Sequence, residues 1–330
     1  MPTLELTLAC GDYDRTRALL DGRVRPDGIA LTALGLPVEE IFFRMLRHRE
    51  FDAAEMSLSS YVVSLAGDDP PFVAIPVFPS RFFRHSCVYV HAESGIERPA
   101  QLAGRIVGAP EYQMTAPVWN RGILADDHGL PVDAVRYVTG GLEEPGRAEK
   151  LKLQLPPGID VTPIPPDRTL ADMLARGEID ALYTARAPST FGDGRGAVRR
   201  LFADFATVER DYFRRTRIFP IMHTVVIRRD VYRRHPWVAQ TLAKAFTAAQ
   251  RLAYADLDRT AALGTMLPWL VAHLDETRRE MGRDFWPYGF AANRDTLATF
   301  LRYSHEQGLS PRRLTPADLF APETLESFKI

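Results

Sequence analysis

The sequence predicts an α/β fold with two lobes, and three features of the chain point to it. Short apolar runs of strand length alternate with amphipathic helical stretches over most of the 330 residues. This length is large for one core and fits two domains or two lobes. Hydrophobic residues make up 46% of the chain and charged residues 25%, which is typical of globular proteins and excludes disordered and fibrous classes.

The first third of the chain predicts strand, helix, strand, helix and strand, in that order. The leucines of LELTLAC alternate with polar residues, as in a half-buried strand. A short helix capped by Asp12 or Asp14 follows, and GIALTALGL predicts the second strand. A helix begins at Pro37, and FDAAEMSLSSY predicts a strand that ends in polar residues.

The middle of the chain predicts a second unit. It begins near residue 91 with a short helix at 99–102, a strand in RIVGAP, a helix from Thr115 and a strand in VRYVTGG. In DRTLADMLARGEIDALYTARAPSTF we expect a helix ended by Gly177, a strand and a loop. HTVVIR predicts a further strand, and Pro236 opens a long helix.

Two strands, SCVYVH and HTVVIR, flank this unit and are the expected crossings between lobes. We therefore predict that residues 1–90 and 216–330 form lobe I and that residues 91–215 form lobe II. The gap between the lobes is the expected ligand site.

Charge and hydropathy limit the partners and the compartment that we expect. The formal net charge is -1, so no whole-molecule field attracts nucleic acid or an anionic membrane. The first residues show no basic segment followed by an apolar one, and no uncharged apolar run reaches about 18 residues. We therefore expect a cytoplasmic protein. The long helices expected at 236–258 and 294–307 leave a homo-oligomer open, since packing within the chain explains them equally.

Several motifs, in order, are similar to those of one known family. The segment ESGIERPAQLAGRIVGAPEYQMT together with GEIDAL resembles the type 2 periplasmic-binding-protein fold. The chain as a whole, from about Leu4 to about Thr324, resembles the 4,5-dihydroxyphthalate decarboxylase family. The motifs that carry this resemblance are LACGDYDRTRALLDGRV, EEIFFRMLRHREFDAAEMSLSSY, DDPPFVAIPVFPSRFFRHS, PEYQMTAPVW, GEIDALYTARAPS, IFPIMHTVVIRRDVYRRHPWVAQ, FWPYGFAANRDTL and RYSHEQGLSPRRLTPADLF.

The resemblance implies a two-lobed fold of mixed sheets flanked by helices, with the ligand in a cleft between the lobes. It also implies a carbon-carbon lyase of phthalate degradation that converts 4,5-dihydroxyphthalate to protocatechuate. Guanidinium groups suit the two ortho carboxylates of such a substrate. Loss of CO2 follows protonation of the ring carbon that carries the leaving carboxylate, and a histidine with a near-neutral pKa suits that proton transfer.

Three residues are the candidate catalytic groups. His85 lies in VFPSRFFRHS, His223 begins the predicted return strand, and Glu55 is a candidate base. If the strand period of two holds, Arg81 and His85 share one face, which makes them the preferred pair for anion binding and proton transfer. A solvated strand edge explains these charges equally, and His223 has the alternative of a hydrogen-bonded core histidine.

Other residues are candidates for substrate binding, and each has a structural alternative. Serine hydroxyls after the third strand either bind phenolic oxygens or satisfy local backbone groups. The turn in PEYQMT either binds an anion at a helix N-terminus or is simply capped by its threonine. The candidate substrate-binding residues are Arg81, Arg84, Arg186, Ser57, Ser59, Tyr112, Gln113 and Thr115.

No cofactor is expected from the sequence. It contains neither HExxH nor a glycine-rich phosphate loop. A divalent metal ion held by Glu55, His85 and His223 is left open. The two cysteines, Cys10 and Cys87, are expected to be buried thiols.

Two other functions stay open at this point. The same fold serves solute-binding proteins, so a receptor that delivers an aromatic acid to a transporter is the first alternative. Another small-molecule enzyme on the same fold is the second. The absence of a secretion signal favours the decarboxylase.

Overall fold

The computed structural model describes residues 3–326, and the chain divides into two compact units. Unit 1 contains residues up to Arg81, then His223–Leu297, and the segment from Thr315 onward. Unit 2 contains Phe82–Met222 and Ala298–Leu314. The boundaries therefore differ from those expected near residues 90 and 216, and residues 298–314 belong to unit 2 rather than to the first lobe.

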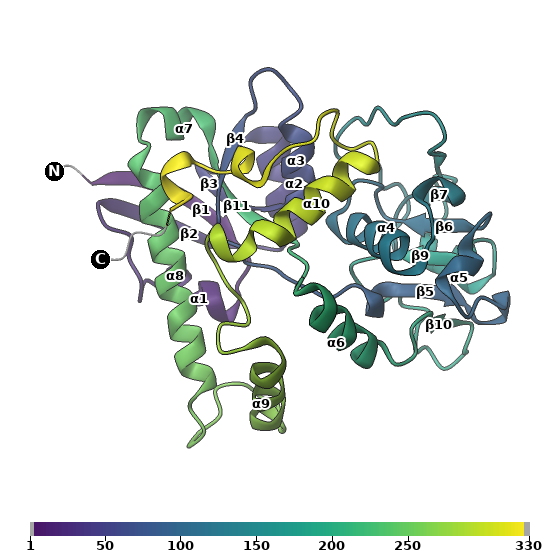
Figure 1. Ribbon diagram of the computed structural model, residues 1–330. Helices are drawn as coiled ribbons and strands as arrows, with labels where there is room; N and C mark the ends of the chain where they lie inside the picture. The colour runs from purple at the N-terminus through teal and green to yellow at the C-terminus, as the bar shows by residue number, and fades with distance from the viewer. Residues whose placement is uncertain (1–2, 327–330) are drawn as a thin grey trace. The chain divides into compact units, whose positions relative to one another are not determined.

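Unit 1 is built on a five-stranded mixed sheet with the strand order β2-β1-β3-β11-β4 (Figure 1). Its strands are β1 (Leu4–Cys10), β2 (Ile29–Gly35), β3 (Ala53–Ser57), β4 (Phe72–Ile75) and β11 (His223–Arg228). β1 runs parallel to β2 and β3, whereas β11 runs antiparallel to β3 and β4. The antiparallel strand therefore brings its first residue to the edge where β3 ends.

Helices cover this sheet and bury its aliphatic side chains. The helices of unit 1 are α1 (Asp14–Leu20), α2 (Val38–His48), α3 (Leu58–Ser64), α7 (Arg229–Arg234), α8 (Trp237–Leu257) and α9 (Leu270–Met281), with short 3-10 turns at Ala291–Asn293, Pro316–Leu319 and Pro322–Thr324. α8 packs along α1, and its apolar residues join those of β1, β4 and β11 in one core (Figure 1). The helix predicted from Pro37 is confirmed as α2, which buries Ile41, Phe42 and Met45.

Unit 2 is built on a six-stranded mixed sheet with the order β10-β5-β9-β6-β7-β8. Its strands are β5 (Val88–His91), β6 (Ile106–Ala109), β7 (Arg136–Thr139), β8 (Val161–Pro163), β9 (Ala181–Tyr183) and β10 (Val198–Arg200). β9, β6, β7 and β8 are parallel neighbours, and β5 is antiparallel to β9 and β10. The loops that follow β9, β6 and β7 therefore emerge at one edge.

The helices of unit 2 are α4 (Thr115–His128), α5 (Leu170–Ala175) and α6 (Phe205–Thr216), with short 3-10 turns at His85–Cys87, Ala92–Ser94, Pro99–Leu102 and Val132–Ala134. α10 (Arg294–Glu306) begins in unit 1 and continues into unit 2. The predicted α/β class with mixed sheets flanked by helices is confirmed. None of the helices described is long and apolar enough to span a membrane.

Three local predictions are wrong. The strand expected at the start of FDAAEMSLSSY is confirmed as β3, but the polar residues after Ser57 lie in helix α3, because the Ser57 hydroxyl accepts a hydrogen bond from the Ser60 N–H and starts the helix. Neither Asp12 nor Asp14 caps α1, whose N-cap is Tyr13. Ser86 and Cys87, predicted as the start of a strand, lie in a 3-10 turn at His85–Cys87, and the chain already passes from unit 1 to unit 2 after Arg81.

Gly122 in α4 allows a close approach that alanine would block. A Cβ at this position would lie 2.1 Å from the Tyr303 ring, which packs against Trp119 and donates a hydrogen bond to Asp126. Alanine ordinarily stabilises a helix interior by about 1 kcal/mol relative to glycine, but overlap with a fixed ring costs about 1–3 kcal/mol beyond that gain. We expect Gly122→Ala to lower the free energy of unfolding in urea. Gly67→Ala, where the added Cβ meets nothing within 4 Å, is the control, and an unchanged G122A midpoint would contradict the packing.

Candidate active site

The carboxyl end of β3 and the amino end of β11 meet at one edge of the unit 1 sheet. In the antiparallel register His223 lies opposite Ser57, and Val225 lies opposite Glu55. Side chains of Glu55 and His223 therefore project from the same face at diagonal positions. This pairing brings together two of the three predicted catalytic residues.

The Glu55 carboxylate is fully buried and receives three hydrogen bonds (side-chain exposure 0%). The Gly11 N–H donates to Oε2 over 2.8 Å, the Tyr13 hydroxyl donates to Oε1 over 3.1 Å, and His223 Nδ1 lies 2.6 Å from Oε1. The Gly11 N–H and the Tyr13 hydroxyl thus treat the carboxylate oxygens as hydrogen-bond acceptors, and Oε1 accepts from His223 in the same way. His223 therefore carries its proton on Nδ1, which leaves Nε2 to exchange a proton with a ligand.

Burial keeps the two other ionisable groups of this cluster neutral. Burial raises the pKa of the Tyr13 phenol above its usual value, and the negative charge of Glu55 raises it further. Burial likewise raises the pKa of the Cys10 thiol, again with help from Glu55. Tyr13 is therefore a hydrogen-bond donor to Glu55, and Cys10 is a poor nucleophile. Both cysteines are buried free thiols, as predicted.

His223 lies between the buried carboxylate and the surface. Its side chain is 16% exposed, and its imidazole meets the edge of the Phe42 ring at a centroid distance of 4.9 Å. The loop that carries Tyr13 is held by Arg15, whose guanidinium lies over the Tyr13 and Trp286 rings at 4.3 Å. The geometry suits proton transfer at Nε2, with Glu55 orienting the imidazole through Nδ1.

Sequence reasoning missed Tyr13 and the Gly11 backbone. A signal was present, because both residues directly follow the carboxyl end of β1, where ligands of parallel sheets bind. The predicted serines follow Glu55 in the chain, where Ser57 caps α3 and Ser59 is fully buried within that helix. Their contact with phenolic oxygens stays a prediction.

The preferred pairing of Arg81 with His85 is wrong. The two residues lie in different units, and His85 begins a 3-10 turn rather than a strand. Arg81, Arg84 and His85 are 4%, 6% and 2% exposed, so a solvated strand edge does not explain them either. Both guanidinium groups are buried within the protein and donate hydrogen bonds to other residues.

Those partners are polar atoms of the protein. Arg81 Nη2 donates to the Pro287 carbonyl over 2.8 Å and to the Asn293 amide oxygen, and burial lowers the pKa of Arg81 to about 9. Arg84 Nε donates to Met222 Sδ over 3.0 Å, and burial lowers the pKa of Arg84 as well. Whether either guanidinium also meets a substrate stays a prediction.

His85 is a buried neutral imidazole. It packs against the Phe202 and Tyr212 rings, and neither of its ring nitrogens has a hydrogen-bond partner among residues 3–326. Burial, followed by the nearby His128, lowers the pKa of His85 from 6.5 to about 4. A catalytic role for His85 stays a prediction, but a proton donor at neutral pH needs a higher pKa.

The lowered pKa of His85 predicts a pH dependence of stability. Between pH 6.5 and 4 the unfolded chain binds a proton at this histidine that the folded chain does not. The contribution of neutral His85 to the free energy of unfolding is therefore fully present above pH 6.5 and is lost as the pH falls toward 4. The shift corresponds to about 3 kcal/mol at most, at ~1.4 kcal/mol per pKa unit. We expect the urea midpoint of the wild type to fall more steeply over this window than that of His85→Gln. Parallel curves would contradict the account.

The edge of the unit 2 sheet carries the remaining predicted residues. Arg186 is exposed in the loop after β9, and Tyr112, Gln113 and Thr115 follow β6. Tyr112 is fully buried and its hydroxyl donates to the Gln307 carbonyl over 3.2 Å. Thr115 is the first residue of α4 and not its cap, which is Met114. The structure thus places three of these residues in one turn.

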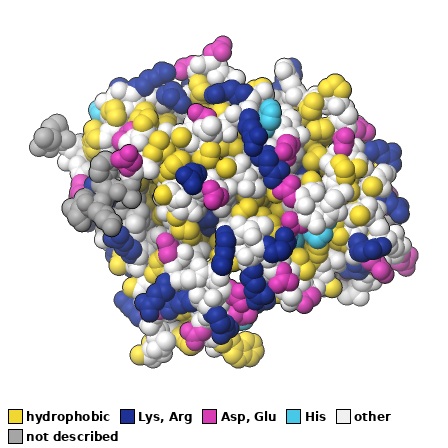
Figure 2. Space-filling view, viewed as in Figure 1, with side chains coloured by type: hydrophobic (Ala, Val, Ile, Leu, Met, Phe, Trp, Pro, Cys, Tyr) yellow, Lys and Arg dark blue, Asp and Glu magenta, His cyan; other side chains and the backbone are white. Residues whose placement is uncertain are grey.

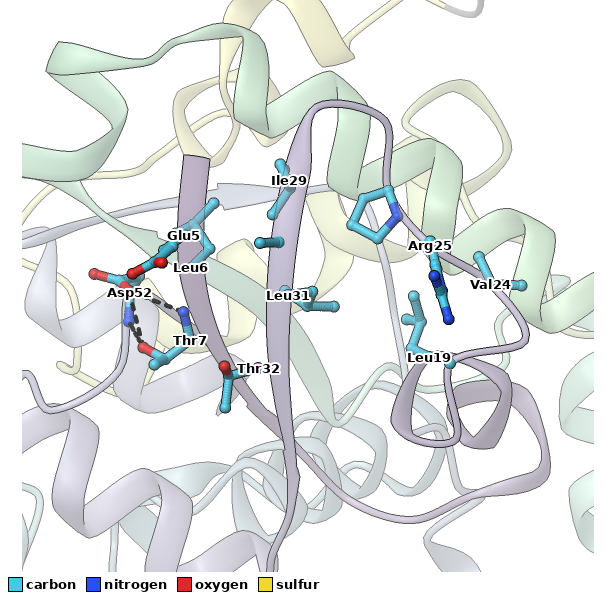
Figure 3. A pocket seen from close by; sticks show the side chains of 13 residues that line it. Glu5, Leu6, Thr7, Leu19, Val24, Arg25, Ile29, Leu31, Thr32 and Asp52 are labelled. Carbon is cyan, nitrogen blue, oxygen red and sulfur yellow. Dashed lines mark hydrogen bonds between the residues drawn. The ribbon is translucent and has the colours of Figure 1, made fainter. Parts of the chain in front are cut away.

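A hollow of about 820 Å³ in unit 1 lies away from the acid-base cluster. It is lined by residues of the first halves of β1 and β2, by Leu19 of α1 and by residues of the loop after α1, such as Arg25 (Figure 3). Its carboxylate Asp52 is bonded to the N–H and hydroxyl of Thr7 (Figure 3). The hollow offers no acid-base pair comparable to Glu55 and His223.

Charge and metal ligands add two facts. On the face drawn in Figure 2, Lys and Arg side chains lie among Asp and Glu side chains, in keeping with the formal net charge of -1. Within the part of the chain that the structure describes, no three His, Cys, Asp or Glu side chains are grouped to hold a metal ion. Of the set left open for a metal, Glu55 and His223 pair with each other and His85 lies in unit 2.

Comparison with solved structures defines the class of fold. The structure is similar to the periplasmic aliphatic sulphonate binding protein SsuA of Escherichia coli, with a TM-score of 0.55 and 16% identity over 99% of this chain and 95% of that chain. A periplasmic sulfonate-binding protein SsuA of Methylobacillus flagellatus gives a TM-score of 0.57 and 14% identity over 98% and 93%. The chain therefore has the α/β fold of periplasmic binding proteins, as predicted.

Comparison of sequences defines the family. The chain is 46% identical over 330 residues to the 4,5-dihydroxyphthalate decarboxylase of Comamonas testosteroni, covering 100% of both chains. It is also 46% identical over 214 residues to the enzyme of the same name from Pseudomonas putida, covering 65% of this chain and 83% of the relative. No family model matches the chain. The chain belongs to the 4,5-dihydroxyphthalate decarboxylase family, which confirms the resemblance.

Proposed function

We propose that the protein is a carboxy-lyase that converts 4,5-dihydroxyphthalate to protocatechuate and CO2. The observation that carries this proposal is the 2.6 Å contact between His223 Nδ1 and the buried Glu55 carboxylate, in a chain of this family. The contact supplies a histidine that is able to deliver a proton, with a fixed charge behind it. This chemistry is what a ring decarboxylation requires of a protein.

The proposed reaction begins with proton transfer from His223 Nε2 to the ring carbon that carries the leaving carboxylate. The new C–H bond takes its electron pair from the ring, and the hydroxyl para to that carbon releases its proton to solvent as the dienone forms. The carbon-carbon bond to the carboxylate then breaks, CO2 leaves, the bonding electrons restore the aromatic ring, and the para oxygen takes a proton back from solvent. One proton is consumed for each CO2, and solvent returns it to His223.

Glu55 performs two tasks in this scheme. It accepts the Nδ1–H, which fixes the tautomer and orientation of the imidazole, and its negative charge stabilises the imidazolium before proton transfer. Gly11 and Tyr13 in turn hold the carboxylate in place. Glu55 and Tyr13 are therefore positioning residues, whereas His223 is the group that meets the substrate.

Turnover assays with matched ligands test the proposal. Purified protein is incubated with 4,5-dihydroxyphthalate or with phthalate, each with and without a chelator, while CO2 and the aromatic product are measured. We expect equimolar CO2 and protocatechuate from the first compound. Phthalate is expected to bind without reacting, because it lacks the hydroxyl that stabilises the dienone. Loss of activity with the chelator would assign a role to a metal ion.

The same assay separates the alternative functions. Binding of 4,5-dihydroxyphthalate without product over hours would contradict the proposal and favour a solute-binding protein. If the protein neither binds 4,5-dihydroxyphthalate nor forms product, that result would favour another enzyme on this fold.

A further inference from the structure

A carboxylate of the protein itself occupies the turn between β6 and α4 in unit 2. The Tyr112 N–H donates a hydrogen bond to Glu149 Oε1, and the Gln113 N–H supplies a second backbone hydrogen bond to this carboxylate. Glu149 belongs to the loop after β7, the parallel neighbour of β6. Two backbone donors at the ligand-binding edge of the sheet thus hold an internal anion.

Buried polar atoms around this turn lack hydrogen-bond partners among residues 3–326. They are both amide atoms of Gln113, Nη1 of Arg121 and Oε2 of Glu149. The Gln113 side chain is 0% exposed and Arg121 is 2% exposed. Native proteins satisfy nearly all such groups. A fully buried amide and a guanidinium N–H that both lack partners indicate a site for a polar ligand.

Among residues 3–326, no acidic side chain is a hydrogen-bond partner of Arg121. Its Nε donates to the Gln307 side-chain oxygen over 2.7 Å, its Nη2 donates to the Tyr112 carbonyl over 2.5 Å, and its guanidinium lies 3.9 Å from the centre of the Tyr112 ring. The hydrogen bond to the Tyr112 carbonyl places the cation directly against the turn. Its positive charge favours an anion at the neighbouring N–H groups.

Glu149 is a weakly held occupant of this position. The cations that flank it in the loop, Arg147 and Lys150, both bind Glu111. Burial, followed by the charge of Glu111, raises the pKa of Glu149 to about 7, although both backbone donors and Arg121 oppose the shift. A carboxylate that is partly protonated at neutral pH and has one bare oxygen is easily replaced.

We propose that the Tyr112-Gln113 turn is a seat for a carboxylate of the aromatic ligand, and that Glu149 is a displaceable internal competitor for that seat. The proposal rests on the proposed function for the class of ligand, an aromatic carboxylate. On binding, the ligand carboxylate takes the two backbone N–H groups and the Gln113 amide, and the loop that carries Glu149 moves away. Glu149 thereby becomes a residue that sets affinity without touching the reacting carbon.

The competition predicts a pH dependence of binding. Ionised Glu149 makes charge-assisted bonds to the turn and repels an incoming carboxylate, whereas protonated Glu149 does neither. Aromatic dicarboxylates lose affinity through this competitor as the pH rises through about 7, the pKa of Glu149. Glu111 faces Glu149 with a negative charge that Arg147 and Lys150 neutralise, and Arg121 faces it with a positive one.

Calorimetric titration with phthalate tests the proposal, because phthalate needs no turnover to be observed. We expect Glu149→Gln to bind phthalate about tenfold more tightly than the wild type at pH 8, the factor that ~1.4 kcal/mol represents, and with nearly equal affinity at pH 6. Glu144→Gln removes the same charge from an exposed position of the same loop and is the control. Adding Gln113→Leu to Glu149→Gln is expected to remove the gain, with circular dichroism checking that each variant folds.

The results separate this proposal from the proposed function. An unchanged or lower affinity of folded Glu149→Gln, an equal gain in Glu144→Gln, or no phthalate binding by any variant would overturn the seat. A gain in Glu149→Gln in a protein that does not decarboxylate 4,5-dihydroxyphthalate would retain the seat and overturn the proposed function. Decarboxylation of 4,5-dihydroxyphthalate by a protein whose Glu149→Gln variant shows no gain in phthalate affinity would retain the proposed function and overturn the seat.

Discussion

Replacing His223 with glutamine is expected to lower kcat for 4,5-dihydroxyphthalate by about 10²–10⁴-fold, the usual contribution of a general acid. Glutamine retains a donor and an acceptor but delivers no proton to the ring carbon. The KM should change far less, because the imidazole acts in the proton transfer and not in holding the carboxylates. Steady-state kinetics over a range of substrate concentrations measure both parameters.

His85→Gln is the control for this experiment. His85 is the other histidine that the sequence offers as a proton donor, but its pKa of about 4 keeps it uncharged at neutral pH. We expect its replacement to alter stability more than kcat. A full kcat in His223→Gln together with a large loss in His85→Gln would reverse the assignment.

Replacing Glu55 with glutamine is expected to lower kcat by about 10²–10⁴-fold as well, because the tautomer of His223 would no longer be fixed. A glutamine offers one acceptor oxygen to the donors from Gly11, Tyr13 and His223, and its own NH2 must face one of them. One buried donor is then left without a partner, which costs about 1–3 kcal/mol of stability. Kinetics and urea unfolding measure the two effects.

Tyr13→Phe is the matched comparison for Glu55→Gln. It removes one of the three hydrogen bonds to the carboxylate and leaves its charge and its contact with His223 intact. We expect a loss in kcat of about tenfold or less, in line with the ~1 kcal/mol of one hydrogen bond. Wild-type turnover in Glu55→Gln would show that the carboxylate does not serve the imidazole.

The sequence singled out Glu55 and His223 as candidates but did not predict that they would hydrogen-bond to each other. Glu55 and His223 each stood at the expected end of a predicted strand, and periodicity is sufficient to find such ends. Their hydrogen bond depends on antiparallel pairing between segments 168 residues apart. No local pattern encodes that register, so the pair emerges only from the fold.

Other features of the site had weak or no local signals. Arg121 lies in the second turn of α4 and looks like an ordinary helix residue, and Glu149 lies in a loop with Glu143 and Glu144. The prediction that Arg81 and His85 share one face was wrong for a different reason. It applied the strand period across a point where the chain leaves one unit for the other. Alternation of side chains predicts facing only within one strand.

Proton NMR of the product formed in D2O tests most directly that the protein releases CO2 by placing a proton on the ring carbon that loses it. Wild-type protein with 4,5-dihydroxyphthalate in D2O should yield one CO2 for each protocatechuate. Each product molecule should carry one deuteron at the vacated carbon and none at the other ring positions. Unchanged substrate after prolonged incubation, or protocatechuate without deuterium at that carbon, would contradict the account.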